Sequence, residues 1–594
     1  MTPQNPYRKI VRQLKKTFTT NICLGKVKKD VRTPCLVFFP YRATTLNCGL
    51  SGIVSYHKGE SKPVHVDLET LLSQIGHIEA YPFSLCSDRK LSLDEHYLGG
   101  AEIIESFREK TRALNDDDQF TAIYFNPDVF SALASLAGRV KSLIATERSA
   151  VETQSGILPP LDVDVLTGRV ETLLDVHWSL EKEIFSNIQK IRELANPPHG
   201  EPTESMVLVF KKINSVLNAI DRLEVRGRDS AGISLLFTLS QQQYDEFMKA
   251  LADEKLSSQL TQRTGGDVLL NHSISINKIK DERHGKRISL GFAYKVAAEI
   301  GSLGDNVHFL RHSIASDRIL QLLTIGSHLN HTVSAHTRWA SVGAISESNC
   351  HPVDNETTGG RTPKSGIIHV CLNGDIDNYI HLKNEYEDRY DKIQNEITTD
   401  TKIIPMPIER HLKTGCDLTT AFLKALNDFE GSHAISMHSD LAPGKLFLGQ
   451  RGSGQAVFVG IAKDHFMPAS EVYGFVEETP YFIKMDGEKI VETPKGKSQG
   501  QLFILDQNAK NPESLVSGIE AMHYDGTPIA LTEADVKHTQ ITSRDIDRQN
   551  FSHYFLKEIT ESPVSVERTI QNRWKIKKTD NRERYVTSLD ESVV

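Results

Sequence analysis

Apolar residues recur along this chain with two periods, and each period predicts a different kind of element. Apolar side chains at helical spacing predict helices over 129–145, 170–195, 205–223, 292–322 and 417–429. Short apolar or alternating runs predict strands over 48–56, 233–239, 331–335 and 367–372, with further short strands between 434 and 492. Alternation of this kind is typical of antiparallel sheet, so we expect mixed helices and strands.

The composition shifts along the chain predict its division into regions. We expect a basic leader or propeptide over 1–47, a main body over 48–492, a mainly helical insertion over 59–205 within that body, and a linker and tail over 493–594. In the leader, Tyr7, Ile10 and Leu14 fall on one helical face with basic residues around it. The leader therefore looks detachable.

The charge of the chain is unevenly distributed. The net charge is −8, but residues 1–47 carry ten Lys and Arg against the single Asp30, which leaves −17 on the remainder. An acidic main body argues against nucleic acid as a partner. No run approaches the roughly 20 apolar residues that a membrane span requires, so we expect no membrane association either.

The seven cysteines are scattered, without a Cys-x-x-Cys pair or a His/Cys ligand spacing. This favours a reducing compartment, and we expect a cytoplasmic protein without a disulfide framework, a metal or a cofactor.

The segment His336–Gly343 reads as the end of a buried strand that opens into a loop. Arg338 beside Trp339 suits a bidentate grip on a carboxylate under an aromatic cover. The alternative is a surface arginine stacked on a tryptophan.

Two further strand ends carry candidate chemistry. Cys48 opens a strand with two glycines and is either a nucleophile or a buried structural thiol. Asn373-Gly374 follows a strand and is either a turn or the side-chain amide and backbone N–H of an oxyanion hole. Arg226 and Asp229, in a tight turn, form either a structural ion pair or part of a pocket.

Taken together, these motifs resemble the glutamine amidotransferases whose nucleophile is an N-terminal cysteine (class II), in particular the glutaminase half of glutamine:fructose-6-phosphate aminotransferase. The segments that carry the resemblance, in order, are Cys48-Gly49-Leu50-Ser51-Gly52-Ile53, Arg226-Gly227-Arg228-Asp229-Ser230-Ala231-Gly232, His336-Thr337-Arg338-Trp339-Ala340, Asn373-Gly374 and Thr399-Asp400-Thr401.

The resemblance implies a role for each of these positions. Cys48 matches the thiol that attacks the side-chain amide of glutamine, with its own α-amino group as general base. Asn373 and Gly374 match the oxyanion donors. Arg338 matches the clamp on the substrate carboxylate, and Asp400 matches the acceptor of its α-ammonium group. Together they would recognise both ends of an amino-acid head group.

The remaining site residues follow from the same resemblance. Arg226 and Gly227 match residues that shape the floor near the nucleophile, Trp339 matches the aromatic cover, and Thr337 is counted with the substrate-binding residues. Because Cys48 is internal as encoded and a peptide nitrogen is no base, activity requires cleavage between Asn47 and Cys48.

The fold that the resemblance implies is an α+β, four-layer αββα sandwich of the N-terminal-nucleophile hydrolases with an inserted helical subdomain. The implied function is hydrolysis of L-glutamine and supply of ammonia for conversion of fructose 6-phosphate to glucosamine 6-phosphate. Phe551–Ile559 looks like the linker into a sugar isomerase domain, and the chain stops soon after it. We therefore expect the sugar isomerase domain on a separate polypeptide or in a part of the protein outside this sequence. Whether the chain forms a homodimer is left open.

Two alternatives stay open at this point. The first is a catalytically inactive amidotransferase-like scaffold or regulatory subunit that uses the insertion as a binding surface. The second is an N-terminal-nucleophile amidase acting on another substrate. Arg338 and Asp400 weigh against the second alternative, because both would be surplus without an amino-acid head group.

Overall fold

The computed structural model describes residues 48–55, 65–154, 158–265, 270–281, 285–297, 303–360, 366–509, 511, 514–549, 551–570, 574–579 and 582–587. The predicted leader at 1–47 lies outside the described residues.

The larger of two antiparallel sheets contains the strand that follows Cys48. Its strands, in spatial order, are β17 (Lys537–His538), β11 (Tyr481–Lys484), β9 (Phe458–Ile461), β10 (His465–Ala469), β1 (Gly49–Ser55), β5 (Asn330–Arg338), β2 (Ser230–Ser240), β4 (Gly285–Ala297) and β3 (Ser273–Asp281). β1 therefore lies in the middle, between β10 and β5, and both neighbours run antiparallel to it.

The second sheet contains the strand that ends in Asn373 and Gly374. In spatial order its strands are β16 (Pro528–Ile529), β15 (Ile519–His523), β14 (Gln501–Asp506), β8 (Lys445–Arg451), β7 (His433–Ser439) and β6 (Ile368–Gly374). Two separate hairpins pair β12 (Ile490–Thr493) with β13 (Gly496–Gln499) and β18 (Trp574–Thr579) with β19 (Arg582–Thr587).

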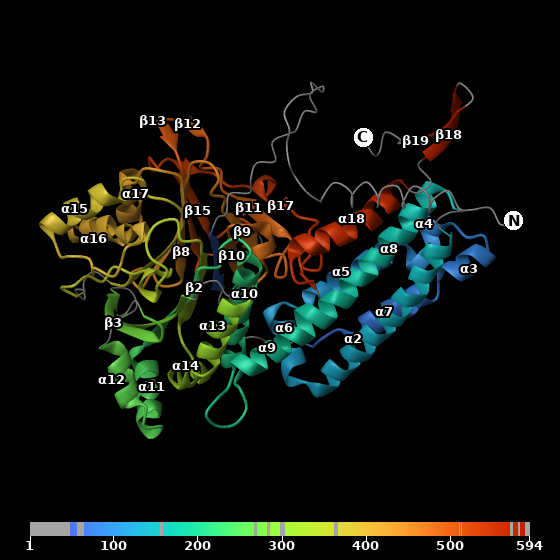
Figure 1. The fold of residues 1–594 in the computed structure, drawn as a ribbon. Coiled ribbons are helices and arrows are strands. Elements are labelled where there is room, and N and C mark those ends of the chain that lie inside the picture. Colours follow the sequence, from blue (N-terminus) through green and yellow to red (C-terminus); the bar gives the residue numbers. More distant parts are fainter. Residues whose placement is uncertain are drawn as a thin grey trace, which may run out of the picture. The chain divides into compact units, whose positions relative to one another are not determined.

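The two sheets pack face to face, with helices on their outer faces (Figure 1). Val54, Leu448 and Phe466, from three strands of the two sheets, pack between them. The helices that cover the nine-stranded sheet are α10 (Glu204–Leu223), α11 (Gln241–Asp253), α12 (Ser257–Thr264), α13 (Asp305–Ala315) and α14 (Arg318–Ile325). Those that cover the six-stranded sheet are α15 (Tyr379–Arg389), α16 (Pro405–Lys413) and α17 (Leu418–Asp428). The predicted four-layer α+β architecture is thus confirmed.

The described residues of the predicted insertion are mainly helical. The helices are α2 (Leu68–Glu79), α3 (Phe83–Asp88), α4 (Leu93–His96), η1 (Tyr97–Gly99), α5 (Gly100–Ala113), α6 (Asp117–Phe125), α7 (Pro127–Gln154), α8 (Pro160–Trp178), the π-helix η2 (Ser179–Ser186) and α9 (Asn187–Leu194). Among the described helices, α7 alone is long and apolar enough to cross a membrane by length and composition. Its Val129, Leu133 and Val140 are buried in the same apolar core as α10, which is typical of a core helix.

Buried ion pairs join these helices to the sandwich. Lys211 and Lys212 of α10 each donate to Asp117 of α6 at 2.7 Å, and Lys212 also pairs with Asp464, just before β10, at 3.2 Å. All four side chains lie in the interior or at its edge. Removal of one partner would leave a buried charge unpaired, so the network fixes how the helices sit on the sheet.

Some predicted boundaries differ from the structure. Residues 292–297, predicted as helix, belong to β4, because Phe292, Tyr294 and Val296 point to one face with period two. The strands of both sheets continue past residue 492, the predicted end of the main body, as far as β17. The remaining short helices are η3 (Glu347–Asn349), η5 (Asp400–Ile403), η6 (Val472–Gly474) and η7 (Glu533–Asp535), and α18 (Tyr554–Ile570) follows them.

Candidate active site

Cys48 directly precedes β1, and its side chain faces the space between the sheets. Successive side chains of a strand point to opposite faces. On β1, Ile53 packs under the helices while Val54 packs between the sheets, and Cys48 has the parity of Val54. Gly49, of the opposite parity, has no room for a side chain, because an added Cβ would lie 2.5 Å from the Cβ of Leu223 in α10. The thiol is therefore directed toward the six-stranded sheet.

β5 brings the His336–Gly343 motif to this thiol. Thr337 pairs with Gly49, which places the next turn of the chain beside Cys48. The backbone N–H of Trp339 donates to Sγ of Cys48 at 3.2 Å, and the thiol donates to the Trp339 carbonyl oxygen at 3.5 Å. The Trp339 side chain is 39% exposed. The backbone of the motif thus fixes the sulfur at the rim of the sheet.

Burial raises the pKa of the Cys48 thiol from 9.0 to about 11. The Trp339 N–H and the Arg338 guanidinium lower this pKa, whereas the carboxylates of Asp400 and Asp375 raise it. Only the thiolate is a strong nucleophile. At neutral pH the sulfur keeps its proton, so an attack by Cys48 requires a base.

Arg338 ends β5 with its side chain 2% exposed. Its Nη1 donates to the carbonyl oxygen of Ala344 at 3.0 Å, and its Nη2 donates to that of Val342. The loop after β5 therefore turns back onto the guanidinium. Burial lowers the pKa of Arg338, but the group stays a cation, and two of its five N–H donors are engaged by the loop. The remaining donors can grip an anion.

Asn373 and Gly374 end β6 in the facing sheet. Nε2 of His336, on β5, donates to Oδ1 of Asn373 at 2.9 Å, and burial lowers the pKa of His336 to about 3, so this ring is neutral. The bond leaves the Nδ2 amide of Asn373 directed away from His336. Gly374 has φ +91°, and an added Cβ would lie 2.1 Å from the Ser432 carbonyl oxygen. A fixed amide and a glycine N–H side by side can donate to one oxyanion.

Asp400 opens the turn η5 and is 4% exposed. Its Oδ2 accepts a hydrogen bond from the Ile376 backbone N–H at 2.9 Å. Burial raises its pKa from 3.8 to about 6, and the nearby Asp375 carboxylate adds to this, while Arg338 opposes it. Pro405 begins α16 directly after the turn, at a position where a missing N–H is tolerated.

The loop after α10 supports the end of β5. An added Cβ on Gly227 would lie 2.7 Å from the Arg338 carbonyl carbon. Asp229 grips the same segment, since its N–H donates to the Arg338 carbonyl oxygen at 3.1 Å and its Oδ2 accepts from the Ala340 N–H at 2.7 Å. Arg226 forms an ion pair with Glu471. The ion pair of Arg226 is therefore not with Asp229, as one alternative from the sequence proposed, but with Glu471. Asp229 instead bonds to the backbone of the segment that follows β5.

Thr337 is the one predicted site residue whose side chain lies on the other face of β5. Its Oγ1 lies beside Gly49, 2.5 Å from the position that a Cβ there would take, on the side of α10. The alternation of the strand therefore separates Thr337 from Arg338 and His336. The role of Thr337 among the substrate-binding residues stays a prediction.

The structure also brings in residues that the sequence did not single out as site residues. They are His336, Asp375 and Asn349. The signal for His336 was present in the sequence, because it has the parity of Arg338 on a strand already predicted to be buried. The others act through contacts between loops distant in sequence.

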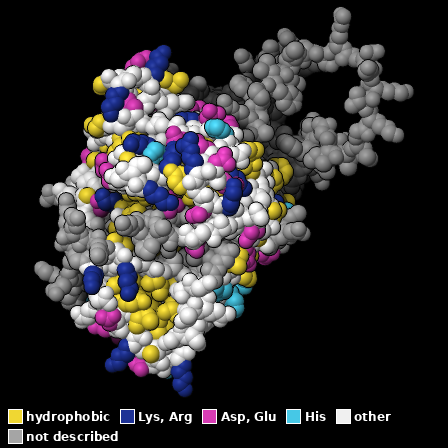
Figure 2. Space-filling view, turned by 90° about the vertical axis from the view of Figure 1, so that its left-hand side faces the viewer, with side chains coloured by type: hydrophobic (Ala, Val, Ile, Leu, Met, Phe, Trp, Pro, Cys, Tyr) yellow, Lys and Arg dark blue, Asp and Glu magenta, His cyan; other side chains and the backbone are white. Residues whose placement is uncertain are grey.

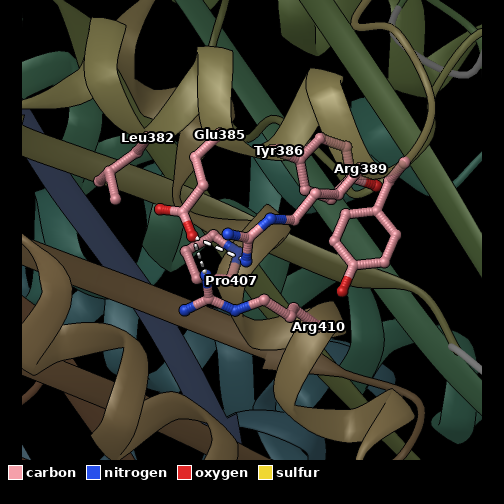
Figure 3. A pocket seen from close by; sticks show the side chains of 7 residues that line it. Leu382, Glu385, Tyr386, Arg389, Pro407 and Arg410 are labelled. Carbon is pink, nitrogen blue, oxygen red and sulfur yellow. Dashed lines mark ion pairs between the residues drawn. The ribbon is translucent and has the colours of Figure 1, made fainter.

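A separate pocket lies on the outer helical layer of the six-stranded sheet, between α15 and α16 (Figure 3). Glu385 pairs there with Arg389 at 3.2 Å and with Arg410 at 3.5 Å, and Arg410 also pairs with Asp428 at 2.8 Å. The carboxylates thus neutralise both arginines. On the molecular face seen in Figure 2, basic and acidic side chains are likewise intermixed. Among the described residues, no group of three or more His, Cys, Asp or Glu is placed to hold a metal ion.

Comparison with known proteins finds relatives for part of the chain. A stretch of 237 residues is 30% identical to the glutamine--fructose-6-phosphate aminotransferase (isomerizing) of Methanothermobacter thermautotrophicus, covering 40% of this chain and 34% of that protein. The enzyme of the same name from Clostridium acetobutylicum is 28% identical over 240 residues, covering 40% and 33%. The chain thus spans about a third of the length of these curated relatives. No protein-family model matches the chain.

Among solved structures, the glutamine phosphoribosylpyrophosphate amidotransferase of B. subtilis is 13% identical, with a TM-score of 0.26 and 49% of each chain covered. The sequence relatives carry the conclusion. Over about 40% of its length, this chain resembles the glutamine--fructose-6-phosphate aminotransferases, and the predicted resemblance to the class II glutamine amidotransferases is confirmed.

Proposed function

We propose that this chain is a glutamine amidotransferase that hydrolyses L-glutamine through a thioester on Cys48. One observation carries the proposal. The thiol of Cys48, held by the Trp339 backbone, faces the strand end that carries Asn373 and Gly374, the proposed oxyanion donors, and the buried charges of Arg338 and Asp400 act on that thiol electrostatically. One fixed cation and one fixed anion suit the carboxylate and ammonium groups of an amino acid.

The residues support a two-step reaction. The sulfur of Cys48 attacks the side-chain amide carbon of glutamine while its proton passes to the α-amino group of the same residue. Asn373 and Gly374 stabilise the oxyanion that forms. The C–N bond then breaks, the proton passes to the leaving nitrogen, and ammonia departs. Water attacks the thioester, giving glutamate and the free thiol.

We infer that cleavage between Asn47 and Cys48 creates the base for this reaction. The pKa of about 11 leaves the half-buried thiol protonated at neutral pH. A free α-amine has a pKa near ~8 and can accept the proton, whereas a peptide nitrogen cannot. A chain that keeps residues before Cys48 would serve as a scaffold or regulatory subunit instead. The residue at the N-terminus therefore distinguishes a glutaminase from an inactive subunit.

The names of the relatives suggest the acceptor. We propose that the ammonia aminates fructose 6-phosphate, giving glucosamine 6-phosphate, together with a sugar isomerase domain or subunit. Glutamine turnover by this chain alone should then be low and should rise when the isomerase and fructose 6-phosphate are both present. Unchanged turnover would refute the coupled role and leave the glutaminase role intact.

The test of the proposed function is glutamate release from L-glutamine by a chain that begins at Cys48. Cys48→Ala in the same chain is the matched control, and L-asparagine and simple acyl amides are the competing substrates. We expect release from glutamine only, and none from the Cys48→Ala variant. Equal turnover of an acyl amide without an amino-acid head group would favour an amidase on another substrate.

A further inference from the structure

Asn349 is a completely buried side chain that uses both ends of its amide. Its Oδ1 accepts hydrogen bonds from the backbone N–H groups of Thr398 at 2.7 Å and of Thr399 at 2.9 Å. Its Nδ2 lies within hydrogen-bond distance of Ser346 Oγ at 2.9 Å, Thr398 Oγ1 at 3.2 Å and the Glu396 carbonyl oxygen at 3.3 Å. One side chain thus contacts two separate loops.

The first of these loops holds the guanidinium of Arg338. Val342 and Ala344 supply the carbonyl oxygens that accept from Arg338, and Asn349 ends the short helix that closes this loop. The loop also contacts the second segment directly, since the Ala344 N–H donates to Thr398 Oγ1 at 3.0 Å. An added Cβ on Gly343 would lie 2.8 Å from the Thr398 carbonyl carbon, so the two backbones are in close contact.

The second segment leads directly into Asp400. Thr398 and Thr399 precede Asp400, and the backbone N–H groups of both donate to Oδ1 of Asn349. The Thr399 N–H is the last backbone donor before η5, the turn that Asp400 opens. The position of the Asp400 carboxylate is therefore set from one side by Asn349 and from the other by the Ile376 N–H.

We propose that Asn349 is a positioning residue that sets the separation between the two charged anchors, Arg338 and Asp400, and so determines the affinity for the head group of an α-amino acid. The inference rests on the proposed function. The carboxylate and ammonium of such a substrate share one carbon atom, so the anchors tolerate little change in spacing. A shift that loses one hydrogen bond to a charged group weakens binding by about 10- to 100-fold.

The chemistry of the residue explains why an amide is suited to this place. The backbone N–H groups of Thr398 and Thr399 need an acceptor, which Oδ1 of Asn349 supplies. Around Nδ2 of Asn349 lie the Glu396 carbonyl oxygen and two hydroxyl groups, which can accept from it. Aspartate would keep the acceptor for Thr398 and Thr399 but lose the donor toward Glu396 and Ser346. Asn349→Asp should therefore loosen the loop of Arg338 more than the segment of Asp400, and Asn349→Ala should loosen both.

The experiment compares Asn349→Ala and Asn349→Asp with Asn355→Ala in chains that begin at Cys48. Asn355 is a matched control, because it is 1% exposed and its hydrogen bonds among the described residues go to two backbone groups outside both anchor loops, the Gly366 carbonyl and the Ile368 N–H. The measurements are KM and kcat for L-glutamine, the rate of Cys48 alkylation by iodoacetamide, and the thermal midpoint. Iodoacetamide has no amino-acid head group, so its rate reports the thiol alone.

We expect Asn349→Ala to raise the KM for glutamine about 10- to 100-fold with kcat within about threefold, and Asn349→Asp to give a smaller rise. Alkylation of Cys48 should change much less than KM in both variants, because burial, the largest influence on the pKa of the thiol, stays the same. Asn355→Ala should lower the thermal midpoint by a similar amount without changing KM. An unchanged KM in Asn349→Ala, or an equal rise in Asn355→Ala, would overturn the inference.

A binding measurement separates this inference from the proposed function. Calorimetric titration of L-glutamate into Cys48→Ala and into Cys48→Ala/Asn349→Ala tests the anchors without catalysis. Weaker binding to the double variant supports the inference even if the chain that begins at Cys48 releases no glutamate, a result that would refute the glutaminase function alone. Equal binding refutes the role of Asn349 whatever the turnover.

Discussion

The N-terminus of the mature chain should control the rate of glutamine hydrolysis. The sharpest perturbation is a single residue. One chain begins at Cys48 and the other begins at Asn47, so that the two differ only in whether the α-amine belongs to the residue that carries the thiol. Neither change touches the buried strands that hold the site, and both chains should fold alike.

The size of the effect follows from two proton equilibria. With a pKa of about 11, four units above neutral pH, about one Cys48 thiol in 10⁴ is ionised at pH 7 without help. A free α-amine with a pKa near ~8 is about one tenth unprotonated at the same pH and can take the proton as the sulfur attacks. The base is thus about 10³-fold more available than the unassisted thiolate, and we expect kcat/KM to be about 10³-fold lower for the chain that begins at Asn47.

The assay is glutamate release as a function of pH. The chain that begins at Cys48 should gain activity up to an apparent pKa near ~8 and then level off, because the amine is the group that titrates. The chain that begins at Asn47 should stay slow and keep rising toward pH 10, since its thiolate is still forming. Thermal midpoints serve as the control for folding. If both chains turn over glutamine at similar rates at pH 7, the α-amine is not the base and the account of Cys48 is wrong.

Three other substitutions and conditions test single parts of the site. Because burial and Asp375 raise the pKa of Asp400 to about 6, its carboxylate is protonated as the pH falls through 6, and the KM for glutamine should rise there. Asp375→Asn should move that rise to lower pH. A KM that is independent of pH between 5 and 7 would contradict this role of Asp400. Gly374→Ala should lower kcat about 100-fold and also the thermal midpoint, because φ is +91° and the Cβ would clash with Ser432; a variant with normal kcat would exclude the Gly374 N–H as an oxyanion donor. Arg338→Lys should raise KM about 10-fold or more with little effect on iodoacetamide alkylation of Cys48, since lysine cannot donate as a planar fork; an unchanged KM would remove Arg338 as the carboxylate clamp.

Signals that act within a strand were readable from the sequence. The strand after Cys48, the helix at 205–223 and the strand before Asn373 are confirmed, because each is long, buried and bounded by turn residues. The wrong prediction at 292–297 concerns the boundary between two periods. Phe292, Tyr294 and Val296 alternate with period two and belong to β4, but a helical pattern follows them closely in the sequence.

Contacts between loops could not be read in this way. Asp229 and Asn349 hold the active-site segments through bonds to Ala340 and to Thr398 and Thr399, residues up to 111 positions away. A lone aspartate or asparagine in a turn has the same local signature whether or not it forms such bonds. The partial burial of Cys48, and with it the raised pKa that requires a base, likewise follows only from the packing of the two sheets.

The course of the chain limits how the inserted helices can act on the thiol. Cys48 precedes β1, while the helices enter after its other end, about 23 Å away for a seven-residue strand. The chain returns through α10, a helix of 20 residues that ends at Leu223, three residues before Arg226. Lys211 and Lys212 on this helix pair with Asp117 of the insertion, and Gly227 beyond its end contacts the backbone of Arg338. Among the described elements, α10 is therefore one connection between the inserted helices and the loop under the thiol, and the segment from Glu471 to Glu477 is a second, since Glu477 bonds to Asn187 and Glu471 pairs with Arg226. A displacement of those helices would reach the active site as a movement of that loop.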